Sequence, residues 1–394
     1  MPLVVFVLAA AVFVQGTSEF MLSGLLEPIA ADLDVPIGSA GLLTSLFAVG
    51  MIIGAPVMAV TAGRWPVRYS LAGFLALFLT VHIVGALTSD FGVLLGTRLV
   101  AAVANAGFLA VALAALPALV GADRVGRATS LILSGVTLAC IAGVPAGAVL
   151  GSTFGWQSAF WAVVLAGTPI LAATWSLVPG QQQRANSAER PRVRDELRAL
   201  RQPAVRLVML VGALVNAATF AGFTYLAVVA TDVGGAGQAW VPVVLALFGI
   251  GSFVGVSTAG RYADRHSRVV IGGGAAVLPL IWIVTALTAR VLPVLLVLTV
   301  IAGAVSFAVG STLIGRIVTA AAPVAPLLNG AFATTAFNIG AAGGPAVAGV
   351  VIAISGSVVA ALWASAALAA IAAIVTALSW RRSEDRVPLT VPTS

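Results

Sequence analysis

The sequence contains no lysine, a single cysteine and few charged residues of any kind. Charged residues make up 8% of the 394 residues and hydrophobic residues 60%, whereas soluble domains carry about 25% charged residues. The lone Cys140 excludes an internal disulfide and a cysteine-rich metal site. The Gly-Lys-Ser/Thr phosphate-binding loop is also missing, which argues against ATP as the energy source. This composition indicates an all-α polytopic membrane protein.

The sequence shows no catalytic constellation either. Paired catalytic acids, histidine clusters and His/Cys/Asp groups with metal-ligand spacing are all missing from it. We therefore expect that the protein is not an enzyme and that it uses no metal or organic cofactor.

Apolar runs of membrane-spanning length fill most of the chain. A bilayer core of about 30 Å requires about 20 apolar residues per helix. The first run is too long for the apolar region of a signal peptide, about 7–15 residues, so we expect it to remain as a spanning helix. Twelve runs can be counted, at about 3–27, 41–62, 70–88, 91–117, 128–152, 158–178, 207–231, 240–260, 269–289, 292–315, 328–354 and 358–380.

The arginines predict the orientation of these runs. If the N-terminus is cytoplasmic, 18 of the 20 arginines fall in cytoplasmic breaks or the C-terminal tail, leaving Arg290 outside and Arg98 within the fourth run. Cytoplasmic loops of membrane proteins are enriched in arginine and lysine. Both termini should therefore be cytoplasmic, in a multi-pass protein of the bacterial plasma membrane. The net charge of +7 comes from short loops and predicts no nucleic-acid partner.

The chain divides into two similar halves. A hydrophilic linker at 180–206 separates a six-helix bundle over 1–179 from a second over 207–380, and a cytoplasmic tail follows at 381–394. AGRWPVRYS at 62–70 corresponds to AGRYADRHSR at 259–268, and GVPAGAVLG at 143–151 to GAAGGPAVAG at 340–349. Paired Gly/Pro interruptions in two halves are typical of transporters built from repeats. The sequence predicts twelve transmembrane helices in two pseudo-symmetric bundles.

Glu19 is a charge in the first of these runs. A carboxylate inside a spanning helix costs about 2.5–3.5 kcal/mol on insertion scales, so it needs a partner or a function. At a rise of about 1.5 Å per residue, Glu19 lies about 12 Å and Arg98 about 10 Å below the outer face. We expect these two charges to influence each other, directly or through water.

Two roles for Glu19 stay open. Gln15, Glu19 and Ser23 share one helix face at i, i+4 and i+8, which predicts a polar stripe facing a central cavity. Glu19 is then a residue that takes a proton and releases it for substrate, or else a structural anchor with a permanent partner. Arg98 either takes part in this coupling or holds one packing of the helices.

Polar and aromatic residues near the midplane are the candidate substrate contacts. Buried amides bind a polar ligand or join helices by hydrogen bonds. Aromatic rings wall a drug pocket or pack in the core, and both possibilities stay open here. The candidates are Asn105, Asn216, Asn338, Phe220 and Tyr225.

Several motifs resemble those of the major facilitator superfamily, within its group of drug:proton antiporters with twelve helices. Gly260 to Arg268, with Asp264 and Arg265, looks like the loop signature between the eighth and ninth helices. The matching N-terminal loop, with Arg64 and Arg68, departs from the signature because Val67 stands in place of the usual Asp. R98-L-V-A-A-V-A-N-A-G107 resembles the Arg-centred motif of the fourth helix, without its usual Gln-Gly.

The resemblance implies gating roles for two of these regions. G143-V-P-A-G147 looks like the exporters' Gly-Pro motif, so Gly143, Pro145 and Gly147 should bend or tightly pack the fifth helix and seal one face of the cavity. Asp264, Arg265 and Arg268 would form a cytoplasmic charge network that holds the outward-open state. The alternative for these arginines is plain cytoplasmic topology.

A closer resemblance, over almost the whole chain, is to the chloramphenicol-resistance exporters of actinomycetes. It implies a proton-coupled exporter of chloramphenicol or a related amphenicol, with protons as the coupling ion and a monomer in the lipid bilayer. Export of a sugar, nucleoside or other metabolite is the alternative, and an intramembrane enzyme or lipid-handling protein is a further one. The stretches that carry the resemblance are QGTSEFMLSGL (15–25), AGLLTSLFAVGMIIGAP (40–56), VANAGFLAVAL (103–113), GWQSAFWAVVL (155–165), GALVNAATF (212–220), LFGIGSFVGVS (247–257) and SFAVGSTLIGR (306–316).

Overall fold

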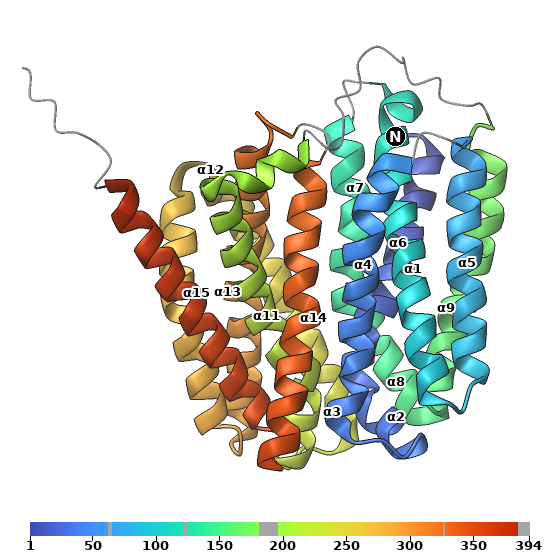
Figure 1. Cartoon of the computed structure of the whole chain (residues 1–394). Coiled ribbons are helices and arrows are strands. Elements are labelled where there is room, and N and C mark those ends of the chain that lie inside the picture. Colours follow the sequence, from blue (N-terminus) through green and yellow to red (C-terminus); the bar gives the residue numbers. More distant parts are fainter. Residues whose placement is uncertain (62–64, 122–124, 181–195, 326–327, 385–394) are drawn as a thin grey trace, which may run out of the picture.

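A computed structural model gives the conformation of the chain and describes residues 1–61, 65–121, 125–180, 196–325 and 328–384 (Figure 1). Some side chains inside the described helices, including those of 261–265, are outside the described part. All regular elements within the described ranges are helical. In lipid this follows from hydrogen bonding, because a spanning segment must satisfy its own backbone N–H and C=O groups.

The first half of the chain builds a bundle that ends before residue 180. Its spanning helices are joined by short turns, and the first one tightens into a single turn of 3-10 helix near its end. The elements are α1 (Leu3–Phe20), η1 (Met21–Gly24), α2 (Leu26–Asp32), α3 (Ile37–Ala40), α4 (Leu42–Thr61), α5 (Val67–Leu87), α6 (Phe91–Val120), α7 (Val125–Leu138), η3 (Ala139–Gly143), α8 (Val144–Phe154) and α9 (Gln157–Leu177).

The second half forms longer helices. Proline stands in the first turn of α11, α12 and α13, where a helix needs no backbone N–H. Gly356, at φ 68°, ends α14 in the left-handed conformation. The elements are η4 (Leu197–Arg201), α11 (Pro203–Asp232), η5 (Gln238–Trp240), α12 (Val241–Leu287), α13 (Leu292–Ala321), α14 (Asn329–Ser355) and α15 (Ala360–Glu384).

The described residues contain 12 helical segments long and apolar enough to cross a membrane, which confirms the predicted number. The runs predicted at 240–260 and 269–289 belong to one continuous element, α12, which departs from helical geometry at His266 (φ −129°, ψ 31°). The run predicted at 128–152 corresponds to Ser134–Phe154 and includes the π-helical turn η3.

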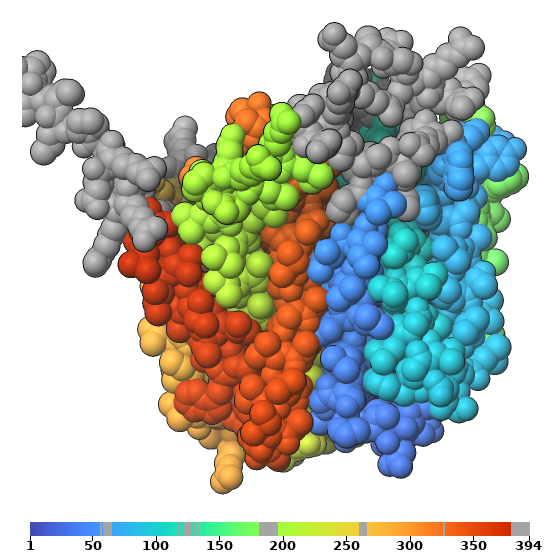
Figure 2. Space-filling view, viewed as in Figure 1, coloured from blue at the N-terminus to red at the C-terminus, as the bar shows by residue number. Residues whose placement is uncertain are grey.

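The two halves lie side by side, with α4 and α14 adjacent at the front (Figures 1 and 2). The chain begins at the upper end of Figure 1 and α15 rises toward that end. We call it the basic end, because Arg68 in the first turn of α5, Arg268 just after the kink of α12 and Arg316 near the end of α13 lie there. Turns at the opposite end carry Glu27, Asp32, Asp34, Asp90, Asp232 and Arg290.

Small residues bring neighbouring helices into close contact at corresponding places within each half. A Cβ on Gly143 would collide with the Thr17 side chain, so η3 packs tightly on α1. A Cβ on Gly340 or Gly344 would lie 2.2 Å from the backbone oxygen of Ala213 or Ala217, so α14 packs equally tightly on α11. Such small-residue contacts are typical of membrane helices. The division into bundles at 180–206 stays a prediction.

Candidate functional site

The end of α1 directs consecutive side chains toward different partners. Ser18 is buried and points into the N-terminal half, where it meets Arg98 of α6. Glu19 and Phe20 line a cavity shared with the C-terminal half. Because the helix tightens from Met21 onward, these residues are its last α-helical turn. One turn of helix thus connects a buried cation to an open cavity.

Arg98 is held by hydrogen bonds to a single residue. Its Nη1 donates to Ser18 Oγ at 2.9 Å and its Nη2 donates to the Ser18 backbone oxygen at 2.8 Å. The guanidinium also lies 4.6 Å from the centroid of the Phe47 ring, a distance typical of a cation–π contact. With 1% of its surface exposed, Arg98 depends on these contacts, since an unsatisfied buried charge is strongly destabilising.

His82 extends this network to α5. Its Nδ1 lies 2.6 Å from the Phe78 backbone oxygen, and its Nε2 lies 2.5 Å from Ser18 Oγ. A carbonyl oxygen only accepts, so Nδ1 carries the hydrogen, and a neutral ring then accepts the Ser18 proton at Nε2. Ser18 therefore donates to His82 and accepts from Arg98, joining α1, α5 and α6.

Glu19 and Arg98 are neighbours through Ser18. Arg98 binds Ser18, the residue directly before Glu19. Within the described residues no ion pair joins them, so any coupling acts across a gap. Sequence reasoning placed both charges but missed Ser18, the residue that links them.

The cavity next to Glu19 has a volume of about 230 Å³. Its wall combines one carboxylate with amides, hydroxyls and aromatic rings. All of it except Glu19 and Phe20 comes from the C-terminal half. The lining residues are Glu19, Phe20, Asn216, Thr219, Phe220, Val256, Ser306, Phe307, Gly310, Ser311, Ile314, Phe337, Asn338 and Ala341.

Three of the predicted substrate contacts, Asn216, Asn338 and Phe220, line this cavity. Asn216 Nδ2 donates to the Phe337 backbone oxygen at 2.6 Å, and Asn338 Nδ2 donates to the Thr334 backbone oxygen at 2.9 Å. These bonds fix both amides, and among the described residues neither amide oxygen accepts a hydrogen bond. The Phe220 ring lies 5.9 Å from that of Phe20 across the two halves.

Serine and threonine side chains of the wall were not predicted. Ser306 is 3% exposed, and its hydroxyl has no hydrogen-bond partner in the described part of the chain. Thr219 and Ser311 bond only to carbonyl oxygens of their own helices. Serine and threonine are common in membrane helices, so nothing in the sequence distinguishes these from others. Only the packing of α11 against α13 brings them to one cavity.

A second cavity, of about 360 Å³, lies nearer the basic end between α4, α6 and α14. Met51, Ala106 and Thr334 are among its lining residues, and most of the rest are alanine, leucine or glycine. Thr334 also accepts the hydrogen bond from Asn338, which connects the walls of the two cavities.

The structure places the other predicted substrate contacts outside both cavities. Gln15 is fully buried and its amide has no partner within the described residues. Ser23 and Asn105 are 2% and 6% exposed and belong to neither lining. The predicted polar stripe therefore reaches the cavity only at Glu19, because the helix tightens at Met21 and Gln15 packs inside the N-terminal half.

Tyr225 closes the opposite end of the molecule instead of lining the cavity. Its hydroxyl lies 3.3 Å from the Gly38 backbone oxygen in the N-terminal half and 3.2 Å from that of Pro345 in the C-terminal half. Gln238 Nε2 donates to Glu27 across the same junction at 2.9 Å. Both cavities lie between this junction and the basic end.

The predicted gating residues are only partly described. Arg64 lies outside the described residues, as do the surroundings of Gly260 and the side chains of Asp264 and Arg265. Arg68 Nε donates to the Val178 backbone oxygen at 2.7 Å, and Arg268 lines a further pocket at the basic end.

The predicted bend in the fifth span is a π-helical turn, η3, directly before Pro145. Gly143 packs on Thr17, and a Cβ on Gly147 would lie 3.0 Å from Met21. The described residues include no group of three His, Cys, Asp or Glu side chains able to hold a metal ion.

Comparison with known proteins agrees with this architecture. The sequence pattern of the Major Facilitator Superfamily matches residues 8–334, more than half of the chain. The chain belongs to the Major Facilitator Superfamily. It is therefore a multi-pass membrane transporter.

Two relatives within the superfamily cover nearly the full length of the chain. A chloramphenicol resistance protein from Streptomyces lividans is 49% identical over 375 residues, which are 95% of each chain. The inner membrane transport protein YdhP from Escherichia coli K12 is 31% identical over 345 residues, 88% of this chain and 87% of the relative. Sequence and fold are thus those of transporters and not of enzymes.

Solved structures confirm the major facilitator fold. A bacterial homologue of the human lysosomal transporter Spinster, in an inward-facing and occupied conformation, superposes with a TM-score of 0.78. The same homologue in an inward-facing and unoccupied conformation gives 0.77. Each match has 16% identity and covers 99% of this chain and 98% of the other.

Proposed function

We propose that this transporter exports chloramphenicol, or a related amphenicol, in exchange for protons. The carrying observation is that Glu19 is the one acidic side chain among the described residues that line the cavity. The relative from Streptomyces lividans, named a chloramphenicol resistance protein, supports the substrate.

The chemistry of the wall suits an amphenicol. Such a drug has an aromatic ring, hydroxyl groups and an amide, and carries no charge. Phe20, Phe220, Phe307 and Phe337 offer aromatic surface, and ring–ring contacts contribute about 0.5–1.5 kcal/mol each. The oxygens of Asn216 and Asn338 accept from hydroxyl or amide groups, while Ser306 supplies a hydroxyl that has no other partner among the described residues.

An uncharged drug competes with the proton through hydrogen bonding. A drug hydroxyl donates more strongly to a carboxylate than to a carboxylic acid. Drug binding therefore favours the ionised form of Glu19, and proton binding favours drug release. Arg98 stabilises the ionised form through space while its own hydrogen bonds to Ser18 hold it in place. Glu19 and Arg98 are the proposed proton-coupling residues.

The distribution of arginines assigns the two ends of the molecule to the two sides of the membrane. We place the basic end in the cytoplasm, so the junction at Tyr225 faces outside and the cavities are those of an inward-facing state. Rocking of the two halves about the cavity would open this junction and close the basic end. We propose that Arg68, Arg268 and the Gly143–Gly147 turn act as gating elements in this motion.

Antibiotic tolerance tests the substrate. The gene is expressed in a bacterium deleted for its own drug exporters, and growth is measured over a panel of antibiotics. We expect severalfold higher tolerance to chloramphenicol and none of this gain in Glu19→Gln at equal membrane abundance. Unchanged tolerance with folded protein in the membrane would contradict drug export and favour export of a metabolite.

A further inference from the structure

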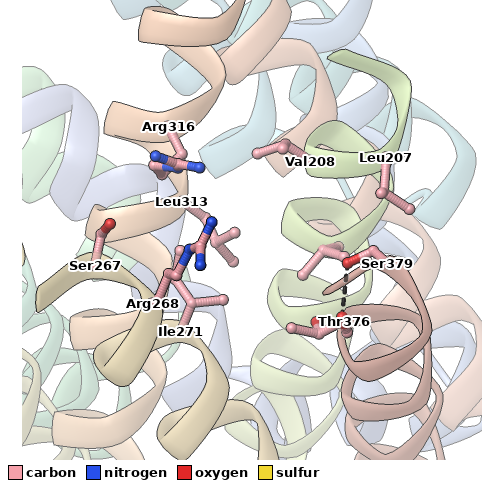
Figure 3. A pocket seen from close by; sticks show the side chains of 10 residues that line it. Leu207, Val208, Ser267, Arg268, Ile271, Leu313, Arg316, Thr376 and Ser379 are labelled. Atoms are coloured by element: carbon pink, nitrogen blue, oxygen red, sulfur yellow. Dashed lines mark hydrogen bonds between the residues drawn. The ribbon is translucent and has the colours of Figure 1, made fainter. Parts of the chain in front are cut away.

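A small pocket at the basic end lies apart from the transport cavities (Figure 3). It is enclosed by α11, α12, α13 and α15 and shares no lining residue with the cavity at Glu19. Its volume is about 50 Å³. A water molecule needs about 10–15 Å³ by the same measure, so the pocket has room for a group larger than water.

Two arginines from different helices face this pocket. Figure 3 shows the guanidinium groups of Arg268, on α12, and Arg316, on α13, next to each other at its mouth. Both side chains are exposed. No acidic side chain belongs to the lining among the described residues. Two like charges side by side repel unless an anion lies between them.

A serine hydroxyl beside the arginines is a further hydrogen-bond donor for an anion in this pocket. Ser267 precedes Arg268 and also lines the pocket (Figure 3). Both residues stand in the first turn after the kink at His266, where the helix dipole also favours an anion. Guanidinium groups bind phosphate oxygens through paired N–H bonds, a geometry that lysine does not offer.

The floor of the pocket is apolar. Leu313, Ile271 and Val211 are buried and Leu207 is half-buried. A phosphate held by the arginines would thus lie next to apolar side chains. Pockets that combine basic groups with apolar walls at helix ends are typical of phospholipid headgroup sites.

We infer that this pocket binds a phosphate group, and that an anionic phospholipid supplies it. Arg268 and Arg316 hold the phosphate oxygens and Ser267 donates a third bond. The acyl chains extend from the mouth of the pocket into the surrounding bilayer. The bound lipid ties α12 to α13 at the basic end, on the side of the bundle away from the substrate.

The first test asks whether lipid protects the arginines of the unaltered protein from chemical modification. Phenylglyoxal, an uncharged reagent, modifies arginines of the full-length chain in vesicles, and mass spectrometry follows each site. Vesicles contain phosphatidylcholine alone, phosphatidylcholine with added inorganic phosphate, or phosphatidylglycerol. Arg206 is the control at the basic end, because it is exposed one residue before Leu207 but lies outside the pocket lining, and Arg290 is the control at the opposite end.

We expect phosphatidylglycerol to slow modification of Arg268 and Arg316 severalfold without protecting Arg206 or Arg290. Protection by inorganic phosphate in phosphatidylcholine vesicles, without protection by phosphatidylglycerol, would support the phosphate site but overturn the lipid as its source. Equal rates at all four arginines in every vesicle would overturn the site itself.

Variants give an independent measure of affinity. Phosphatidylglycerol is titrated against the thermal unfolding midpoint of the purified transporter in detergent, with phosphatidylcholine as the control lipid. Each arginine near a membrane surface contributes about fivefold in affinity for anionic lipid, so Arg268→Gln with Arg316→Gln should weaken binding on the order of thirtyfold. Arg206→Gln should leave it unchanged. Equal lipid-dependent shifts in the double variant and the unaltered protein would contradict the proposal.

Discussion

Ser18 is the residue on which the buried charges depend. Counting residues along the first and fourth spans predicted that Glu19 and Arg98 share one depth, because helix rise is uniform. Counting does not give the direction of each side chain around its helix axis. That direction is set by packing, which turns Ser18 toward Arg98 and His82 and leaves Glu19 toward the cavity.

We predict that Ser18→Ala destabilises the protein. The change removes the acceptor for Arg98 Nη1 and the partner of His82 Nε2, and a hydrogen bond to a charged group contributes about 1.5–3 kcal/mol. The midpoint of thermal unfolding in detergent should fall.

Ser45→Ala is the matched control for this change. Ser45 is also buried, but its hydroxyl has no partner among the described residues, so its removal should leave the midpoint unchanged or raise it. Equal effects of the two substitutions would show that the Ser18 bonds contribute nothing.

Only some of the predicted substrate contacts line the cavity, again because counting residues gives the depth of a side chain but not its direction. Asn216, Phe220 and Tyr225 stand on one helix, yet only the first two line the cavity. Tyr225 lies further along α11 and reaches the junction at Gly38. Depth alone separates these positions by little more than two turns, so the sequence could not distinguish a cavity wall from a seal.

At the scale of the helices, close contacts at glycine determine how neighbouring helices pack. The sequence predicted twelve spans because long apolar runs and charged breaks follow directly from the lipid environment. The Gly/Pro motif at 143–151 also predicted a bend or tight packing of the fifth span, with 340–349 as its counterpart in the second half. The sequence did not predict that this bend is the π-helical turn η3, in which Gly143 packs on Thr17.

Adjacent glycines of α14 allow a sharp test of this packing. Gly344 leaves no room for a Cβ, which would lie 2.2 Å from the Ala217 backbone oxygen, whereas a Cβ on Gly343 would meet nothing within 4 Å. Gly344→Ala should separate α11 from α14 and destabilise the protein by about 1–3 kcal/mol. Gly343→Ala should be neutral or stabilising by up to about 1 kcal/mol. Thermal unfolding and transport rate of both variants check this, and equal behaviour would refute it.

At the scale of the whole molecule, two halves meet at the opposite end and enclose cavities toward the basic end. The similarity of the halves was predicted from their loops and motifs. The closed end is identified by side chains such as Tyr225 and Gln238, whose partners lie about two hundred residues away in sequence. No local sequence pattern predicts such long-range pairs.

A reversible cross-link should lock this junction. Glu27→Cys with Gln238→Cys, in a Cys140→Ala background, places thiols where a hydrogen bond of 2.9 Å now joins the halves. A short bis-methanethiosulfonate linker should abolish drug transport, and reduction should restore it. Drug binding should persist, because the cavities remain open toward the basic end.

The control pair lies within one half. Gln157 Nε2 donates to Asp32 at 3.1 Å in the N-terminal half, so linking Asp32→Cys with Gln157→Cys should leave transport intact. Full activity of the cross-linked Glu27/Gln238 pair would show that this junction need not open.

The central claim is that Glu19 exchanges a proton for drug. Uptake of labelled chloramphenicol into inside-out vesicles, driven by an acidic interior, measures this most directly. Asp34→Asn is the control, because Asp34 is an exposed acid with φ 49°, a conformation that Asn accepts. We predict gradient-driven uptake by the unaltered protein and by Asp34→Asn, and none by Glu19→Gln. Uptake at the unaltered rate in Glu19→Gln would contradict the claim.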